Sequence, residues 1–444
     1  MSIVAVRAGL SLLALSVWAA VLAQEMPVEL APVEVRATRT VLALEDLPGA
    51  ITVIDGDDLR RGRMPSSLAE ALVGVPGLFI QNAGNFSQDA RIALRGFGAQ
   101  AAFGIRGVAI LVDGVPQTLP DGQAQVDSID LAEVERIEIL RGVILITTRP
   151  MGEQASASVR QDFGAFGRFD THAALSAPVG PVGLRLSAGR FERDGFRDHS
   201  RVEQYRANLK LDWRPSTHTR IDATAGYFEA PEEQDPGSVT ADQARRMPRA
   251  ARDANVRFDA GETLEQWRFS TGVRHRLGGD PNHRLRLTGF AFLRDFANKL
   301  PFSGGGQVAF DRRFTGLDAQ HEIQREVFGR NLLLTSGVDL RRQRDERERF
   351  DNLEGARGDR VLDQRERVDA IGVYAQAGIA LAPRWRLTAG LRFDEVQLDV
   401  DDRLLVGAPR RTQSDGAAYM FRRVDGVWTE EQRIEAGPAR ALLF

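Results

Sequence analysis

The stretch Arg91–Gly142 decides the fold, and it reads RIALRGFGAQAAFGIRGVAILVDGVPQTLPDGQAQVDSIDLAEVERIEILRG. Its segment Val108–Val112 is apolar and β-prone, and Asp113-Gly114 behind it is a turn pair, because glycine accepts positive φ freely. Val134–Leu140 alternates apolar residues with charge and suits a buried strand, whose charges should be paired. Taken alone, these residues fit a plain α+β domain with glycine-rich turns.

Three pieces of this stretch stand at a characteristic spacing: Arg95–Gly98 (RGFG), Val112–Pro116 (VDGVP) and Val134–Gly142 (VERIEILRG). Each piece is a weak signal, but their order over fifty-two residues resembles the plug domain of TonB-dependent outer-membrane receptors. With Pro120–Gln123 (PDGQ), the run is most similar to the subgroup that imports pyrroloquinoline quinone. The resemblance implies a ligand-gated transporter of a Gram-negative outer membrane.

Composition sets the first limits. The chain has 444 residues, 43% of them apolar, with a net charge of −3 and no cysteine. This length allows two or three domains, and the charge balance gives no indication of nucleic-acid binding. Without cysteine, a disulfide scaffold, a thiolate metal site and a lipid-anchoring cysteine are all excluded.

The N-terminus predicts export. Residues 1–23 carry Arg7 followed by the apolar run Ala8–Leu22 and a small residue at Ala23, which is typical of a cleaved signal peptide. An N-terminal anchor helix is the alternative, but the run is short for a membrane span. We therefore expect an exported protein cleaved after Ala23.

Residues 24–40 contain an extended segment, LAPVEVRATRT at Leu30–Thr40. An extended, tethered segment can add a strand to the sheet edge of a partner through main-chain hydrogen bonds. The resemblance implies a TonB box here, with the periplasmic energy-coupling protein TonB as the partner. Its residues are Pro32, Val33, Glu34, Val35, Arg36, Ala37 and Thr38. A flexible tail behind the cleavage site is the alternative.

Residues 41–150 are predicted to form a small α+β plug domain. A strand is expected over Leu47–Ile54 and a short helix over Ser66–Val73, which begins with a capping box of Ser67 and Glu70. After Arg141-Gly142 the strand Val143–Thr148 follows at once, where the family has a further segment of small residues. We expect an internal deletion there; a natural short variant is the alternative.

Residues 151–400 change to period-2 alternation, which predicts an antiparallel transmembrane β-barrel. Apolar positions alternate with charged ones in several ladders, for example Tyr205, Ala207, Leu209, Leu211 and Trp213 against Arg206, Asn208, Lys210 and Asp212. About eleven strands are expected up to Val400, whereas a plugged transporter barrel has about 22. The barrel is therefore expected to be incomplete, with outer-membrane lipid around it.

Short and long connections are expected to alternate along these ladders, as they do between the two sides of an outer-membrane barrel. The predicted short connections lie at Pro178–Gly183, Arg214–His218, Gly278–His283, Val327–Asn331 and Leu381–Arg384. The predicted long ones lie at Glu192–Val202, Glu229–Glu262, Ala297–Arg313 and Arg341–Arg367. The charged run RRQRDERER at Arg341–Arg349 is predicted to be a solvated outer loop.

Residues 401–444 change character again. The pieces LVGAP at Leu405–Pro409, DGAAYMF at Asp415–Phe421 and WTEEQ at Trp428–Gln432 resemble one FG-GAP blade of an integrin-type β-propeller. One blade cannot close a propeller, so we expect a fusion scar or a stray repeat. A barrel hairpin with a coincidental match is the alternative.

Catalytic chemistry is not indicated. The six histidines are scattered, and there is no HExxH, GxSxG or P-loop motif. Glu232, Glu233 and Asp235 lack the spacing of a calcium loop and are predicted to form an exposed acidic loop. We therefore expect no enzyme, no cofactor and no metal site.

Ligand binding is expected at the outward apices of the plug, in Asn82–Gln88, Gly98–Gly104 and Leu119–Gln125. The aromatic candidates for stacking a flat ligand are Phe86, Phe97 and Phe103, and the polar candidates are Asn85, Gln100, Asp121 and Gln123. The alternative is that the aromatic residues only pack the plug into the barrel. Arg95, Arg106 and Arg141 are expected to pair with carboxylates of the barrel wall.

The mechanism implied by the resemblance is energy-coupled uptake, in which a solute binds outside and TonB pulls on the plug. Pyrroloquinoline quinone is the expected solute, and a ferric siderophore is the alternative. A truncated or chimeric product without transport is a different class, because an open sheet leaves unsatisfied edges in lipid. A secreted adhesion or propeller protein is a third class, which would need several FG-GAP blades.

Overall fold

The computed structural model describes residues 34–35, 42–43, 51–61, 66–81, 84–101, 104–140, 142–382, 385–408, 417–424 and 427–435. The chain divides into two compact units, Met1–Pro48 and Gly49–Phe444. In the first unit, β1 (Glu34–Val35) pairs antiparallel with β2 (Leu42–Ala43). The predicted signal peptide lies outside the described residues.

The second unit begins with a small α+β domain built on a five-stranded sheet of order β3-β10-β11-β7-β8. Its strands are β3 (Thr52–Asp55), β7 (Ala109–Val112), β8 (Val115–Pro116), β10 (Val134–Leu140) and β11 (Val143–Thr148). Two strand pairs flank the sheet, β4 (Leu78–Gln81) with β5 (Arg91–Leu94) and β6 (Ile105–Arg106) with β9 (Gln123–Ala124). Its helices are α2 (Gly56–Arg60), α3 (Leu68–Ala71) and the 3-10 turn η2 (Leu131–Glu133). The predicted plug architecture is confirmed.

Apolar residues of these elements form one core. Its fully buried members come from both strand sets and from α3, and include Leu72, Ile92, Ile110, Val134, Ile137, Ile144 and Ile146. The predicted capping box is formed only in part: Ser67 Oγ accepts from the Glu70 amide at 3.3 Å, but the Glu70 carboxylate accepts from the Ser66 amide at 2.7 Å. The charge within β10 is paired as predicted, with Arg136 Nη2 2.8 Å from Glu138 Oε1.

The strands β10 and β11 form a direct hairpin. Leu140 stands opposite Val143, so only two residues connect the strands, and Gly142 takes a φ of 71°. The Gly142 carbonyl accepts from the Ala109 amide at 2.8 Å, which ties the turn to β7. The shortened connection is thus compatible with a continuous sheet.

A 13-stranded antiparallel sheet follows, with each strand hydrogen-bonded to the next from β12 to β24. The first strands are β12 (Ser156–Phe163), β13 (Phe169–Val179), β14 (Val182–Arg193), β15 (Val202–Ser216), β16 (Thr219–Gln234), β17 (Gly261–Arg276) and β18 (His283–Lys299). The others are β19 (Gln307–Val327), β20 (Arg330–Leu353), β21 (Ala356–Ala382), β22 (Trp385–Ala408), β23 (Ala417–Val424) and β24 (Val427–Glu435). Eleven of these strands, β12 to β22, begin before residue 400, as predicted.

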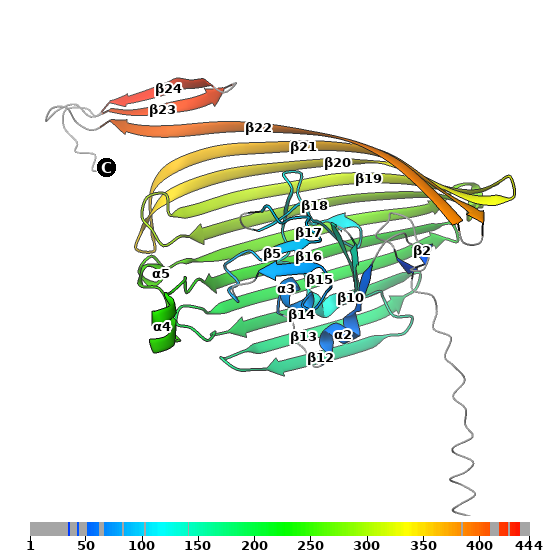
Figure 1. Ribbon diagram of the computed structural model, residues 1–444, viewed down its shortest axis with the longest axis horizontal. Coiled ribbons are helices and arrows are strands. Elements are labelled where there is room, and N and C mark those ends of the chain that lie inside the picture. Colours follow the sequence, from blue (N-terminus) through cyan, green and yellow to red (C-terminus); the bar gives the residue numbers. More distant parts are fainter. Residues whose placement is uncertain are drawn as a thin grey trace, which may run out of the picture. The chain divides into compact units, whose positions relative to one another are not determined.

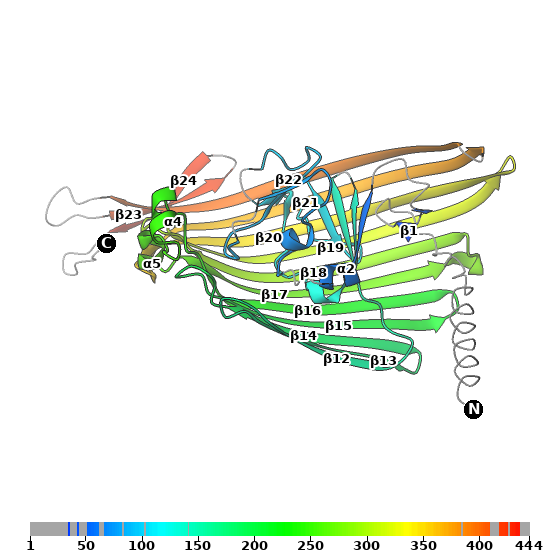
Figure 2. The same ribbon diagram turned by 60° about the horizontal axis from the view of Figure 1, so that its bottom comes forward.

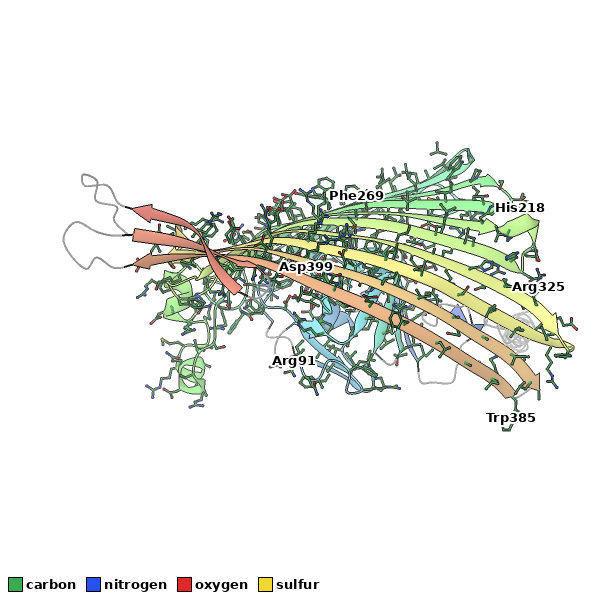
Figure 3. The ribbon with its side chains drawn as sticks, turned by 90° about the horizontal axis from the view of Figure 1, so that it is seen from above. Arg91, His218, Phe269, Arg325, Trp385 and Asp399 are labelled. Carbon is green, nitrogen blue, oxygen red and sulfur yellow. The ribbon has the colours of Figure 1, made fainter. Side chains whose placement is uncertain are left out.

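The two faces of this sheet differ as the alternation predicts. The plug elements lie against one face of the sheet (Figures 1 and 2). The polar side chains of Asn208 and Lys210 contact them. On the opposite face Trp213, Trp267 and Phe269 are 42–44% exposed, and Phe269 points away from the plug (Figure 3). A sheet with a polar, plug-facing side and an apolar outer side is the expected wall of a membrane barrel.

The connections also differ between the two ends of the sheet. His218, Arg325 and Trp385 lie at the end that carries the short connections (Figure 3). At the other end, residues 235–260 contain α4 (Ala241–Arg246) and α5 (Asp253–Arg257). The short 3-10 turn η3 (Leu277–Gly279) joins β17 to β18.

The prediction of a loop over Arg341–Arg349 is wrong. These residues lie inside β20 and pair with β19 and β21, so the connection to β21 shrinks to Glu354-Gly355. The charges are matched by partners on neighbouring strands, as in Arg347–Glu366 at 2.7 Å and Arg342–Asp369 at 2.6 Å. The predicted long connection Ala297–Arg313 likewise shortens to residues 300–306.

The predicted boundary near residue 400 falls within β22, and β23 and β24 extend the same sheet. In the described part of the FG-GAP-like segment, β23 therefore pairs with β22 on one side and β24 on the other. Within the described ranges, no helix has the length and apolar character needed to cross a membrane.

Candidate functional site: the plug–wall interface and the outward apex

The plug is held to the sheet by carboxylates on the plug and cations on the wall. Glu133 of η2 accepts two hydrogen bonds from Arg185 of β14, at 2.5 and 2.9 Å. Asp113, between β7 and β8, accepts from Lys210 Nζ at 3.2 Å. Asp127 accepts from Arg294 Nη2 of β18 at 2.9 Å. Three ion pairs therefore distribute the contact from β14 to β18.

Among the described residues, Arg95 and Arg106 do not form the predicted ion pairs with carboxylates of the wall. Arg106 donates to the Asp121 carbonyl within the plug at 3.1 Å, and the Arg95 side chain packs against Gly77. Arg141 lies outside the described residues. The sequence showed alternating charges on the wall, but it gave no means of telling which of them would meet the plug.

Hydrogen bonds from uncharged side chains of the wall add to the ion pairs. Asn208 Nδ2 donates to Asp130 Oδ2 at 2.9 Å, and Gln266 Nε2 donates to Ser128 Oγ at 2.8 Å. Ser128 and Gln266 are each 2% exposed. Buried polar groups need hydrogen-bond partners, so these contacts fix the position of the plug on the wall.

The structure explains why aspartate and glycine stand together at the turn Asp113-Gly114. Asp113 Oδ1 accepts from the Thr148 amide at 2.9 Å, and this bond fastens the turn to β11. Gly114 has a φ of 85°, and a Cβ there would lie 2.6 Å from Arg286 Nη2 of the wall. The turn thus needs glycine for its backbone, and a side chain at this position would also oblige the flexible end of Arg286 to shift.

Glu133 is the most strongly stabilised anion of the interface. Burial by itself raises the pKa of this plug carboxyl, but the neighbouring His172 ring, whose Nε2 is 3.3 Å away, and the bonds from Arg185 outweigh burial and lower the pKa to about 2. Glu133 is therefore ionised at neutral pH, and the pair with Arg185 is a charged one.

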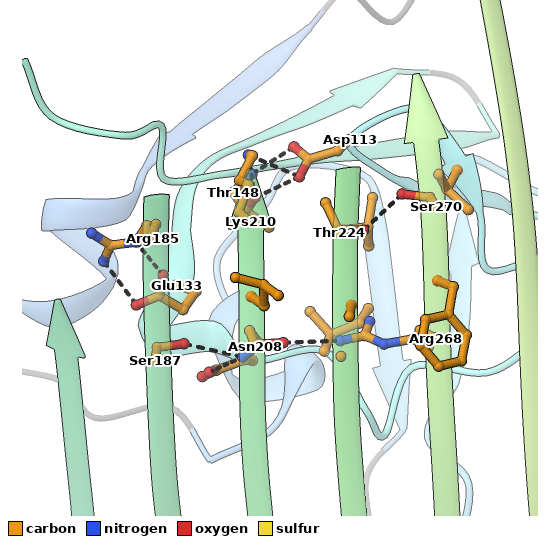
Figure 4. Close-up of a pocket in the computed structure, with 18 of the residues that line it drawn as sticks. Asp113, Glu133, Thr148, Arg185, Ser187, Asn208, Lys210, Thr224, Arg268 and Ser270 are labelled. Carbon is orange, nitrogen blue, oxygen red and sulfur yellow. Dashed lines mark hydrogen bonds and ion pairs between the residues drawn. The ribbon is translucent and has the colours of Figure 1, made fainter. Parts of the chain in front are cut away.

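A cavity of about 90 Å³ separates the plug from β14–β17 beside these pairs. Two neighbouring rows of cross-strand partners form its wall (Figure 4). One row comprises Arg185, Lys210, Thr224 and Ser270, and the other comprises Ser187, Asn208, Gly226 and Arg268. The wall side of the lining combines these polar side chains with Leu209, Ala225, Phe269 and Phe292, and the plug side carries Asp113, Asp130 and Glu133.

The predicted binding residues Asn85 and Phe86 lie at a second cavity, of about 70 Å³. Asn85 Nδ2 donates to Asp235 Oδ1 at 2.7 Å, at the start of the long connection behind β16. The Phe86 ring lies 5.5 Å from that of Phe191, and the Arg193 guanidinium lies 5.0 Å above it. This half of the expected apex therefore combines an aromatic surface with a cation.

The other candidates divide between two places. The Gln123 backbone amide donates to Asp121 Oδ1 at 2.9 Å. The side chains of Gln123 and Asp89 both lie beside Gly104, and Asp89 belongs to the same plug loop as Asn85. Phe97 instead packs against Gly142 and is 50% exposed, while Gln100 is exposed. Phe103 lies outside the described residues. The structure thus places Asn85 and Phe86 at one cavity, Asp121 and Gln123 together beside Asp89, and Phe97 against Gly142.

The expectation of an exposed acidic loop at Glu232, Glu233 and Asp235 is wrong. Glu233 belongs to β16, is 3% exposed and accepts from Gln204 Nε2 at 2.5 Å. Asp235 accepts from Asn85 and also from Gln88 Nε2 at 3.1 Å. The strand is longer than its sequence suggested, because neutral and plug partners satisfy these carboxylates.

Asp89 gives the apex a titratable group. Burial first and the nearby Asp127 second raise its pKa to about 6, against the opposing effect of Arg294 and Arg312. Asp89 is partly exposed to solvent, and solvation of its carboxylate limits the rise of its pKa. Among the described residues, no three histidine or carboxylate side chains are placed to hold a metal ion.

Comparison with known proteins identifies the class. Residues 43–145 match the family described as TonB-dependent receptor plug domain. Residues 154–429 match the family described as TonB dependent receptor-like, beta-barrel. The second match covers more than half of the chain, so the chain belongs to the TonB-dependent receptors, a family of outer-membrane receptors and transporters rather than enzymes.

Similar proteins extend this result. A hemin receptor of Yersinia enterocolitica is 24% identical over 323 residues, which are 65% of this chain and 44% of that protein. A hemin receptor of Yersinia pestis is 36% identical over 109 residues, 24% of this chain and 15% of that protein. The chain thus spans less than half the length of these curated relatives.

Solved structures share the fold. The unliganded ferric citrate transporter FecA superposes with a TM-score of 0.68 at 15% identity, over 85% of this chain and 63% of that one. The ferripyoverdine receptor of Pseudomonas aeruginosa, bound to ferripyoverdine, gives a TM-score of 0.63 at 13% identity, over 89% and 64%. These relatives are named for hemin and ferric chelates, and they do not support the narrower subgroup that imports pyrroloquinoline quinone.

Proposed function

We propose that the chain supplies the plug and a large part of the barrel of an energy-coupled outer-membrane receptor for an iron chelate. The observation that carries this proposal is the seating of the plug on the polar face of the wall through Glu133–Arg185, Asp113–Lys210 and Asp127–Arg294. A plug that is held in the lumen by ion pairs blocks passive diffusion of the ligand. Transport therefore requires energy to move the plug.

Hemin or a ferric siderophore is the ligand class that we favour over pyrroloquinoline quinone. The curated relatives named above are hemin receptors, and hemin is flat and carries carboxylates. The apex offers matching chemistry in the Phe86 ring and the Arg193 guanidinium above it. Asn85, Asp121 and Gln123 would supply hydrogen bonds, while Phe97, Gln100 and Phe103 remain weaker candidates.

TonB is the proposed partner. Within Pro32–Thr38, Glu34 and Val35 are extended in β1 and already pair with another segment. Exchange of that pairing for a strand of TonB would follow the usual chemistry of strand addition. With the predicted cleavage after Ala23, this segment would stand close to the new N-terminus in the periplasm.

A product without transport is the second candidate. In the described sheet, β12 and β24 each have one neighbour, so each presents an unpaired edge. Lipid cannot satisfy backbone donors and acceptors, and each unsatisfied group costs several kcal/mol there. This 444-residue chain therefore needs further strands around it before it can close a barrel.

Growth on hemin separates the two candidates. A receptor-deficient strain that expresses this chain is compared with the same strain expressing a longer relative, with hemin as the iron source. Growth on hemin that requires TonB supports the receptor. A chain that reaches the outer membrane, binds hemin and never restores growth supports the product without transport.

A further inference from the structure

The cation Arg268 occupies an unusual position in the cavity between the plug and the wall. Four cationic side chains line this cavity, Arg149, Arg185, Lys210 and Arg268, against the three carboxylates Asp113, Asp130 and Glu133. Arg185 is committed to Glu133, Lys210 contacts Asp113, and Arg149 lies 3.6 Å from Asp57. The cavity therefore holds more positive groups than negative ones.

Arg268 differs from these cations in its partners. In the described part of the chain its hydrogen bond goes to Asn208 Oδ1, at 3.5 Å, and no carboxylate lies within ion-pair distance. A guanidinium carries five N–H donors, so this single bond uses only one of them. The side chain is partly buried and lines the cavity (Figure 4).

The neighbouring strands are shaped to hold this side chain. Gly226 stands directly opposite Arg268, and a Cβ there would lie 3.1 Å from Arg268 Nη2. The absent side chain at Gly226 lets the guanidinium cross β16 to Asn208 on β15. Asn208 is fixed by its bonds to Asp130 and Ser187, at 2.9 and 3.2 Å. Arg268 is thus positioned by two uncharged neighbours, and the carboxylates Asp130 and Asp113 act on it only at longer range.

We propose that Arg268 forms a subsite for a carboxylate group in the plug–wall cavity. A guanidinium recognises a carboxylate through two parallel N–H···O bonds, and a low-dielectric surrounding strengthens them. Ser270, two residues further along the same strand and in the adjacent row of the wall, would complete such a site. The cavity has room for a carboxylate with a short stem, but a whole chelate requires the plug to move.

The carboxylate could belong to the transported ligand or to a small free acid. In the first case, which rests on the proposed function, Arg268 would be an intermediate binding site for the ligand after it leaves the outward apex. The path of the ligand would run between the plug and β14–β17, where a cavity lined by Arg185, Lys210 and Arg268 already exists. A chelate with carboxylate arms would then exchange its contacts at the apex for contacts with Arg268.

Propionate is the probe for the subsite. The purified chain in detergent is heated in sodium propionate and in sodium chloride at equal ionic strength. A ligand that binds the folded state raises Tm, so we expect a rise of about 2 °C or more in propionate for the wild type. Arg268→Gln should lose this rise, and Arg274→Gln should retain it, because Arg274 lies on the same strand and is paired with Asp222 at 2.9 Å.

Chemical protection tests the same subsite without any substitution. Phenylglyoxal modifies accessible arginines, and mass spectrometry measures the modification of Arg268 and Arg274 separately in the wild-type chain. Propionate should reduce the modification of Arg268 several-fold and leave that of Arg274 unchanged. Equal modification of Arg268 with and without propionate, or a Tm rise that survives in Arg268→Gln, overturns the proposal.

The source of the carboxylate is decided by uptake of hemin and of its dimethyl ester. If the ligand supplies the group, Arg268→Gln slows the uptake of hemin several-fold and changes that of the ester little. An equal effect on both compounds assigns the subsite to a free acid. If the wild-type chain takes up neither compound, the proposed function fails, while the propionate experiments still decide the subsite.

Discussion

Arg185 on β14 donates two hydrogen bonds to Glu133 of the plug, and both side chains are about one-tenth exposed. Removal of one partner from such a pair leaves a buried charge without compensation. We expect Glu133→Ala to weaken the seating of the plug by about 3–5 kcal/mol. Limited proteolysis of the plug in detergent measures this, and Glu192→Ala is the control, because Glu192 belongs to a more exposed network with Arg190. Equal protease sensitivity of the two variants would contradict the prediction.

Acid should loosen the same contact. The pKa of Glu133 is about 2 in the fold, against an ordinary value of 4.5 for a glutamate carboxyl, so the folded state favours the ionised form. The resulting stabilisation is complete above the unfolded pKa and is lost as pH falls from about 4.5 toward 2. The difference in Tm between the wild type and Glu133→Gln should therefore be constant near neutral pH and shrink in acid. A difference that stays the same down to pH values near 2 would show that another group is responsible.

Gly114 offers a test with a matched control. Gly114 and Gly122 have nearly the same φ, 85° and 87°, but a Cβ at Gly114 meets Arg286 and a Cβ at Gly122 meets nothing within 4 Å. Both Gly→Ala changes carry the backbone strain of positive φ, of order 1 kcal/mol or more. Gly114→Ala should be the more destabilising in thermal unfolding, and Arg286→Ala should remove the excess. An excess that persists without Arg286 would place the clash elsewhere.

The proposed TonB box can be tested by a proline. Val35→Pro removes a main-chain donor that an added strand would need, so it should abolish TonB-dependent uptake and leave ligand binding unchanged. The substitution is best made in a longer relative that carries this segment. Val35→Ala keeps the donor and serves as the control. Normal uptake by the proline variant would move the box to another segment.

The sequence predicted the features that depend on local pattern. Period-2 alternation identified the strands β12 to β22, and the Asp113-Gly114 pair identified a turn. The charged run at Arg341–Arg349 was misjudged because its neutralising partners, such as Asp369 and Glu366, lie on another strand. The choice of Glu133, Asp113 and Asp127 as plug anchors depends on contacts between residues far apart in the chain, which periodicity does not contain.

Asp235 joins the plug apex to the long connection behind β16. Its two carboxylate oxygens accept from Asn85 and Gln88, at 2.7 and 3.1 Å, and hold the plug loop that carries Phe86. Asp235→Ala should release this loop, so that ligand binding must order it again. Ordering a side chain costs about 0.5–1.5 kcal/mol, which predicts a roughly twofold to tenfold loss of hemin affinity.

Hydrogen exchange of residues 84–89 and hemin titration of the full chain measure the two effects together. Asp242→Ala is the control, because Asp242 lies on α4 of the same connection, is exposed and pairs only with the exposed Arg245 and Arg246 among the described residues. Faster exchange with unchanged affinity would remove the plug loop from the binding site. Unchanged exchange in Asp235→Ala would show that Phe191 and Arg193 hold the loop through Phe86 without the carboxylate.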